Sequence, residues 1–196
     1  MTGLRNCHAH GVDSVVLSTY PDGRPHVRMF VTRPDHTLWR NSALHGFASI
    51  AVHSHRADLM LKQIYGPVFN VRARVEKGGL EQDTFSSWAY ESALLRRYAP
   101  GFSELGARFL STKNEDMRGH KVVFMDAGEL HTVFVPKGRE AAWFVTENGL
   151  AETYKNVVYS NADLTTFSFD GMYEEMGNDE IEATLQDAMV RMGQHS

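Results

Sequence analysis

The alternation of apolar and polar positions predicts a chain built mainly from short β-strands. Residues 12–20 are rich in β-branched side chains and end in the turn sequence Tyr20-Pro21-Asp22-Gly23, so residues 26–32 are expected to return as the second strand of a hairpin. Further strands are expected at 37–41, 50–56, 59–65, 68–75, 121–125, 130–135, 141–146, 157–160 and 164–169. Such a series indicates an antiparallel sandwich or barrel.

Two segments show helical periodicity instead. Apolar residues recur at helical spacing over 84–99, Pro100 would end that helix, and a further helical piece at 103–110 completes a predicted helical insertion at about 81–118. Near the end of the chain, Ile181, Leu185 and Ala188 follow the spacing of one helix face, which predicts a helix over about 179–192. Asn178 is its expected N-cap.

Length, charge and cysteine content narrow the class of protein. The 196 residues suit a single domain, 1–196, and the net charge of −4 with scattered basic residues argues against nucleic-acid binding. No apolar run reaches the ~20 residues that a membrane helix needs. Cys7 is the only cysteine, so no intrachain disulfide can form. We expect a cytoplasmic protein without a membrane partner.

The histidines supply the candidate chemistry. His53 and His55 are two residues apart in an apolar run, so on a strand their side chains leave the same face and can share one metal ion. Because the chain has only one cysteine, further ligands must be histidine, carboxylate or water. The alternative is a pair of ordinary histidines on a half-buried strand.

This segment also carries a family resemblance. The spacing from His53 to Gly66, followed by Pro67 and Asn70, resembles the first signature of the cupin superfamily, and residues 128–138 resemble the opening of the second. The resemblance implies a single-domain jelly-roll β-barrel with its site in the lumen. Two usual ligands are absent, because the family's glutamate falls at Leu59 and its later histidine at Ala141.

A third ligand must therefore come from elsewhere. His131 is the best candidate, since alternation places it on one face of the strand that enters Pro136. Asp58 is weaker, because its odd distance from His55 points it the other way along an unbroken strand. Such a set leaves open positions around Fe(II), Mn(II), Ni(II) or Zn(II), as a catalytic site requires.

Other polar residues are candidates for ligand contact or for covering the site. Strands that are otherwise apolar contain four of them: Arg28, Arg40, Tyr65 and Asn70. An inward Arg would indicate a carboxylate or phosphate ligand, whereas an outward one would indicate a solvated strand face. The pair His8 and His10 is expected to lie on a solvated terminal arm, or else to close the site, and His36, His45 and His120 are expected at the surface.

Two functions follow from different classes. The first is a metal-dependent cupin-type enzyme acting on a small polar molecule, with iron an Fe(II) oxygenase, and with zinc or manganese a Lewis-acid isomerase or hydrolase. The second is a metal-free cupin-like protein that binds a small ligand without catalysis. In either case Met189 and Met192 give the C-terminal helix apolar surface, and we expect a homodimer.

Overall fold

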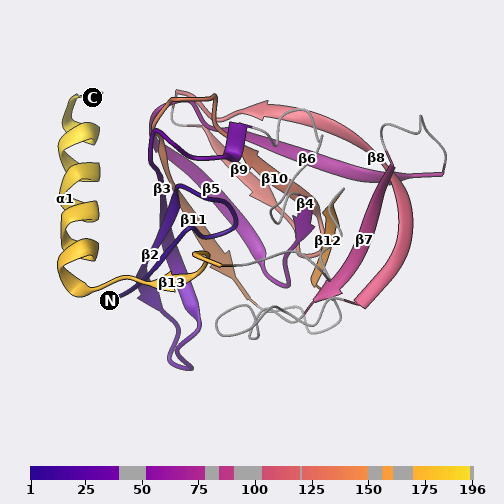
Figure 1. The fold of residues 1–196 in the computed structure, drawn as a ribbon, viewed down its shortest axis with the longest axis horizontal. Helices are drawn as coiled ribbons and strands as arrows, with labels where there is room; N and C mark the ends of the chain where they lie inside the picture. Colours follow the sequence, from indigo (N-terminus) through magenta and orange to yellow (C-terminus); the bar gives the residue numbers. More distant parts are fainter. Residues whose placement is uncertain are drawn as a thin grey trace.

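The computed structural model describes residues 1–39, 52–77, 84–90, 103–119, 121–149, 156–160 and 170–194. Its strands form two antiparallel sheets (Figure 1). The first sheet has seven strands in the order β13 (Glu174–Glu175), β1 (Thr2–Arg5), β2 (Val12–Thr19), β3 (Pro25–Thr32), β11 (Ala142–Asn148), β5 (Asp58–Tyr65) and β9 (Val122–Met125). The second closes into a ring of six: β10 (Leu130–Phe134), β4 (Val52–Ser54), β12 (Asn156–Ser160), β7 (Thr84–Tyr90), β8 (Ser103–Asp116) and β6 (Phe69–Glu76).

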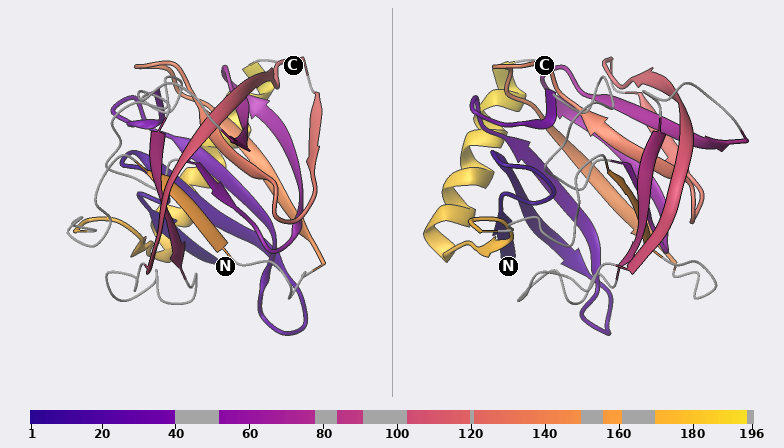
Figure 2. Two further views of the ribbon diagram at one scale, coloured as in Figure 1. Left: turned by 90° about the vertical axis from the view of Figure 1, so that its right-hand side faces the viewer. Right: turned by 45° about the vertical axis from the view of Figure 1, so that its right-hand side comes forward.

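The seven-stranded sheet is covered on both faces. Figure 2 shows the ring of strands on one side of this sheet and the helix α1 (Asn178–Gln194) on the other. Alternate residues of β3 and β11 serve the two sides: Phe30 and Trp143 belong to the main core, whereas Met29 and Ala142 pack in the cluster that includes Ala188 of α1. A separate cluster is formed by ring residues, with Val52, Ala73, Leu110 and Tyr159 as its buried members.

Helix α1 is capped at its start and held by an ion pair near its end. At its start the backbone N–H of Gly177 donates to Glu180 Oε2 at 2.9 Å, and the carbonyl of Gly177 accepts from Ile181 at 3.0 Å, so Gly177 is the N-cap and the Asn178 prediction is off by one residue. At its end Arg191 donates to Glu140 at 2.7 Å. Met189 is 68% exposed on this helix, so association through it stays a prediction.

The mainly antiparallel β prediction is confirmed, and the jelly-roll topology stays a prediction. The hairpin of β2 and β3, strands β5, β6, β9, β10, β11 and β12, and the C-terminal helix lie close to their expected positions. None of the described helices is long and apolar enough to span a membrane.

The helical insertion is wrong where the structure describes it. Residues 84–90 and 103–116 are the paired strands β7 and β8, and residues 109–116 of β8 also pair with β6. The non-local pairing overrides the helical spacing of the apolar residues, because cross-strand partners form the backbone hydrogen bonds and determine which face of each strand is buried.

The expected strand at 37–41 is also wrong in its described part, where residues 38–39 form a short helical turn. Residues 91–99 and 164–169 lie outside the described part.

The end of β5 depends on a glycine. Pairing shifts by one residue where Tyr65 meets Ala142 and Gln63 meets Trp143, so Ile64 is a bulge, and Gly66 follows with φ of 72°. A Cβ at this glycine would lie 2.7 Å from the Cα of Ala141 and closer still to the carbonyl oxygen of Glu140. No other residue type fits this close approach of two backbones.

We expect Gly66→Ala to destabilise the protein more than Gly138→Ala does. Gly138 has a similar φ of 69° but open space around its Cα, so its replacement costs only the backbone strain of about 1–2 kcal/mol. The clash at Gly66 should add about 2 kcal/mol or more. Urea unfolding of both variants measures the difference, and equal losses would show that no steric constraint acts at Gly66.

Candidate metal centre

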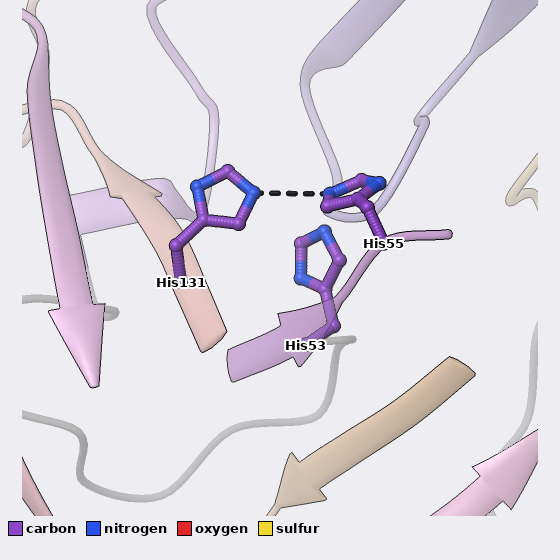
Figure 3. A group of neighbouring side chains, drawn as sticks. All are labelled: His53, His55 and His131. Carbon is purple, nitrogen blue, oxygen red and sulfur yellow. Dashed lines mark hydrogen bonds between the residues drawn. The ribbon is translucent and has the colours of Figure 1, made fainter. Parts of the chain in front are cut away.

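Three histidines meet where β4 of the ring pairs with β10 (Figure 3). His53 on β4 is the direct cross-strand partner of His131 on β10, and His55 follows immediately after β4 ends. One ring nitrogen of each lies within 4.8 Å of the others, and the Nε2 atoms of His55 and His131 are 3.0 Å apart. Two imidazole nitrogens bound to one metal at about 2.1 Å are about 3.0–3.4 Å apart, so this spacing suits a common ion.

The site faces the seven-stranded sheet. Neighbouring residues on a strand point to opposite sides, so His53 points away from Val52 and the cluster of ring residues. The cavity beside the histidines is lined by the seven-stranded sheet, by the β4 and β10 region and by the loop that follows β1. The predicted site therefore lies between the two sheets, in the described part of the chain.

A chain of hydrogen bonds holds His131 from behind. Its Nδ1 lies 2.8 Å from Oδ1 of Asn70, which is fully buried, and Nδ2 of Asn70 donates to Glu115 Oε2 at 3.0 Å. Arg72 donates to the same carboxylate oxygen at 2.8 Å and to Glu129 at 2.7 Å. The chain runs from a surface ion-pair group to the buried histidine.

This chain fixes the tautomer of His131. A carboxylate only accepts hydrogen bonds, so Asn70 turns its amide N–H toward Glu115 and its oxygen toward His131. We therefore assign the proton to Nδ1 of His131, which leaves the lone pair on Nε2 facing His55. Histidines that bind metals are oriented in this way by a partner on their second nitrogen.

His8 does not lie on a solvated arm, the first of its two expected positions. It is half-buried, lines the cavity and stacks on His53 with ring centroids 5.0 Å apart and planes at 22°, which agrees with the alternative that it helps to close the site. Its φ of 68° is unusual for a residue with a side chain, and the turn after β1 imposes it. The His-x-His spacing was a usable signal, although its partner His10 is exposed, as expected for a solvated arm.

Burial favours the uncharged form of three histidines at this site, namely His8, His55 and His131. It is the main cause that lowers the pKa of His8, His55 and His131 well below 6.5. The neighbouring His53 adds to the lowering at all three, and the positive charge of Arg28 contributes at His8 and His55. Neutral imidazole is the form that binds a metal ion, so the protonation state near neutral pH suits a ligand role.

A cavity that opens to solvent lies beside the histidines. An apolar cavity with a few polar groups is the usual form of a small-molecule site. Most of its described lining is apolar, and two charged residues, Arg28 and Glu147, lie on the same wall. The apolar and aromatic lining residues are Val12, Phe30, Leu38, Leu59, Leu61, Val133, Trp143 and Val145.

Of the four residues expected to contact a ligand, the structure places some at the site and others away from it. Arg28 lines the cavity, and Asn70 lies behind His131 as its hydrogen-bond partner. The expectation that Tyr65 contacts the ligand is wrong. The bulge at Ile64 turns its side chain to the opposite face of the sheet, where it packs near Ala188 and below Arg191. Arg40 lies outside the described residues.

The remaining polar candidates are also placed. Asp58 is exposed and accepts a hydrogen bond from the backbone of Ala127 at 2.8 Å, away from the cluster of ligand atoms. Leu59, at the position of the family's glutamate, is buried in the cavity wall. The expectation that His36 lies at the surface is wrong, because it is buried and its Nε2 lies 2.9 Å from the carbonyl oxygen of Arg139. His45 and His120 lie outside the described residues.

Comparisons with known proteins add little. No protein-family model matches the chain, and no curated protein matches it. Among solved structures, the polyketide cyclase RemF from Streptomyces resistomycificus is similar at 13% sequence identity and a TM-score of 0.38, over 86% of this chain and 84% of that chain. A likeness this weak carries no argument, so the cupin resemblance still depends on the sequence motifs alone.

The tautomer of His131 gives a first prediction for the site. We expect the metal-free protein to carry its proton on Nδ1, which long-range ¹H–¹⁵N spectra of the imidazoles detect. Asn70→Leu removes the acceptor and should abolish this preference, whereas Glu129→Gln, which alters a contact of Arg72 but none of Asn70, should keep it. A His131 proton on Nε2 in the unmodified protein would contradict the assigned chain.

The lowered pKa values give a second prediction. Below pH 6.5 the unfolded chain binds protons on these histidines before the folded protein does, so the free energy of unfolding falls as pH falls toward the lowered pKa values. Each histidine contributes up to about 1.4 kcal/mol per pH unit. Urea unfolding of chelator-treated protein between pH 7.5 and about 5.5 measures this slope.

A matched pair of variants assigns that slope to the site. His131→Gln should flatten the pH dependence, because it removes one of the buried groups, and His10→Gln, at an exposed position, should leave it unchanged. A flat profile in the unmodified protein would show that the histidines protonate as easily in the folded state as in the unfolded chain.

Proposed function

We propose that His53, His55 and His131 hold a divalent metal ion in an enzyme that acts on a small molecule bound in the adjoining cavity. One observation carries the proposal: three imidazoles converge within 4.8 Å, and the hydrogen bond to Asn70 already turns the Nε2 lone pair of one of them toward the others. A chance grouping of surface histidines would have neither the burial of His53 and His131 nor this orientation.

The donor set fits a catalytic ion better than a structural one. Structural zinc sites in proteins usually complete four protein ligands, whereas three histidines leave positions for water or substrate. Imidazole suits zinc, nickel, iron and manganese to different degrees, so the donors do not select one metal. When bound, such an ion supplies Lewis-acid polarisation of a substrate oxygen, and with iron it also supplies sites for oxygen.

The chain's own residues have distinct roles in this proposal. His53, His55 and His131 bind the ion, and Asn70 orients His131. The apolar wall that includes Leu59 and Leu61 excludes water from the side of the cavity next to the histidines. The substrate is therefore a small molecule with polar atoms for the ion and an apolar body for the wall.

A second candidate is a metal-free cupin-like binding protein. The observation that favours it is Leu59, which occupies the family's glutamate position and contributes an apolar side chain to the cavity. In that case the 3.0 Å contact between His55 and His131 is a hydrogen bond of two neutral imidazoles.

Metal content separates the two functions. We expect tag-free protein, reconstituted with Zn(II), Ni(II), Mn(II) or Fe(II) and dialysed, to retain about one ion per chain. Replacing His53, His55 or His131 with Ala should weaken zinc binding at least about 100-fold, and a double replacement should cost little more, because the three act as one unit. His10→Ala is the matched control and should bind normally.

Two results would contradict the proposal. Full occupancy in His131→Ala would remove that residue from the ligand set. Absence of metal in the unmodified protein after reconstitution would decide for the binding protein.

A further inference from the structure

A half-buried cation shares the cavity with the histidines. Arg28 lies on β3 two residues before Phe30, so both side chains reach the cavity on the same face. Its Nε is buried and makes no hydrogen bond among the described residues; Glu147 Oε1 lies 3.4 Å away, as an ion pair without hydrogen-bond geometry. A buried guanidinium N–H without an acceptor is costly, which points to an acceptor that arrives with a ligand.

The charge balance of the cavity points the same way. Arg28 and Glu147 are the formally charged side chains in its described lining, and they offset each other. Three neutral imidazoles bring no negative charge to a divalent ion. With the ion of the proposed function in place, the cavity carries two uncompensated positive charges, so a ligand that brings negative charge is favoured.

A column of rings gives the shape of that ligand. Trp143 and Phe30 are stacked at 5.4 Å and 7°, Phe30 and His8 at 6.2 Å and 27°, and His8 and His53 at 5.0 Å and 22°. All four line the cavity, and because their faces cover each other, the inner rings offer mainly their edges to it. Ring edges are positive and attract the electron-rich face of another aromatic ring.

We infer that the cavity binds a planar aromatic carboxylate, whose ring packs against this column and whose carboxylate accepts hydrogen bonds from Arg28. The inference rests on the proposed function for the charge of the ion beside His53. Arg28 suits the task because a guanidinium group binds a carboxylate through two parallel hydrogen bonds. Glu147 competes for the same group in the ligand-free cavity, so it limits the affinity.

Three probes test the two parts of the ligand. Naphthoate has the ring and the charge, naphthamide has the ring alone, and cyclohexanecarboxylate has the charge without the aromatic face. Isothermal titration should show naphthoate binding about 10-fold or more tightly than either of the others, because a hydrogen bond to a charged group contributes a factor of this order. Equal binding of naphthoate and naphthamide, or no binding of naphthoate, would overturn the inference.

Two variants with opposite expected effects locate the charge recognition. Arg28→Gln should remove the preference for naphthoate over naphthamide, whereas Glu147→Gln should strengthen naphthoate binding several-fold, because it frees Arg28. Arg24→Gln is the matched control, since Arg24 is paired with Asp22 on the exposed turn of the same hairpin. A preference that survives in folded Arg28→Gln, or weaker naphthoate binding in folded Glu147→Gln, would contradict the inference. If Arg28→Gln does not fold, Glu147→Gln decides.

Each titration is run on zinc-loaded and on chelator-treated protein, with the zinc content measured separately. Zinc binding without a preference for naphthoate overturns the inference and leaves the proposed function standing. An Arg28-dependent preference in a protein that binds no metal overturns the proposed function and leaves a carboxylate-binding cavity.

Discussion

The backbone pairing of β4 with β10 is the contact on which the candidate site depends. It is short, but it sets His53 directly opposite His131 and places His55 where β4 ends. Side chains opposite each other on paired strands lie about 5 Å apart at Cβ, which is the distance at which two imidazoles reach one ion. Displacing either strand by one residue would send its histidine to the other face.

Residues on neighbouring strands orient the side chain of His131. Asn70 reaches His131 from the neighbouring strand β6, and Glu115 on β8 determines which end of that amide faces the histidine. The site is therefore connected through three adjacent ring strands to the ion pairs of Arg72 near the surface. The seven-stranded sheet contributes the other wall, with its aromatic column and Arg28.

This arrangement lowers the stability of the folded state. Several neutral imidazoles and a guanidinium group are held in a mostly apolar cavity, and burial disfavours the charged form of each histidine whose pKa is lowered. Such a concentration of perturbed groups is typical of functional sites, because a packing core of the same size would use apolar side chains at these positions. The apolar core on both sides of the seven-stranded sheet offsets the cost.

The sequence by itself determined the local elements whose signals are local. Turn residues and alternation were enough for the hairpin of β2 and β3, and periodicity was enough for α1; the two-residue spacing singled out His53 and His55, and strand alternation suggested His131. Tertiary structure decided what depends on distant partners. Pairing made β7 and β8 strands despite their helical spacing, one bulge carried Tyr65 out of the site, and folding of the N-terminal segment brought His8 into it. The reason is physical: a periodic pattern records which face is buried, whereas the partner that covers that face is set by contacts between residues far apart in the chain.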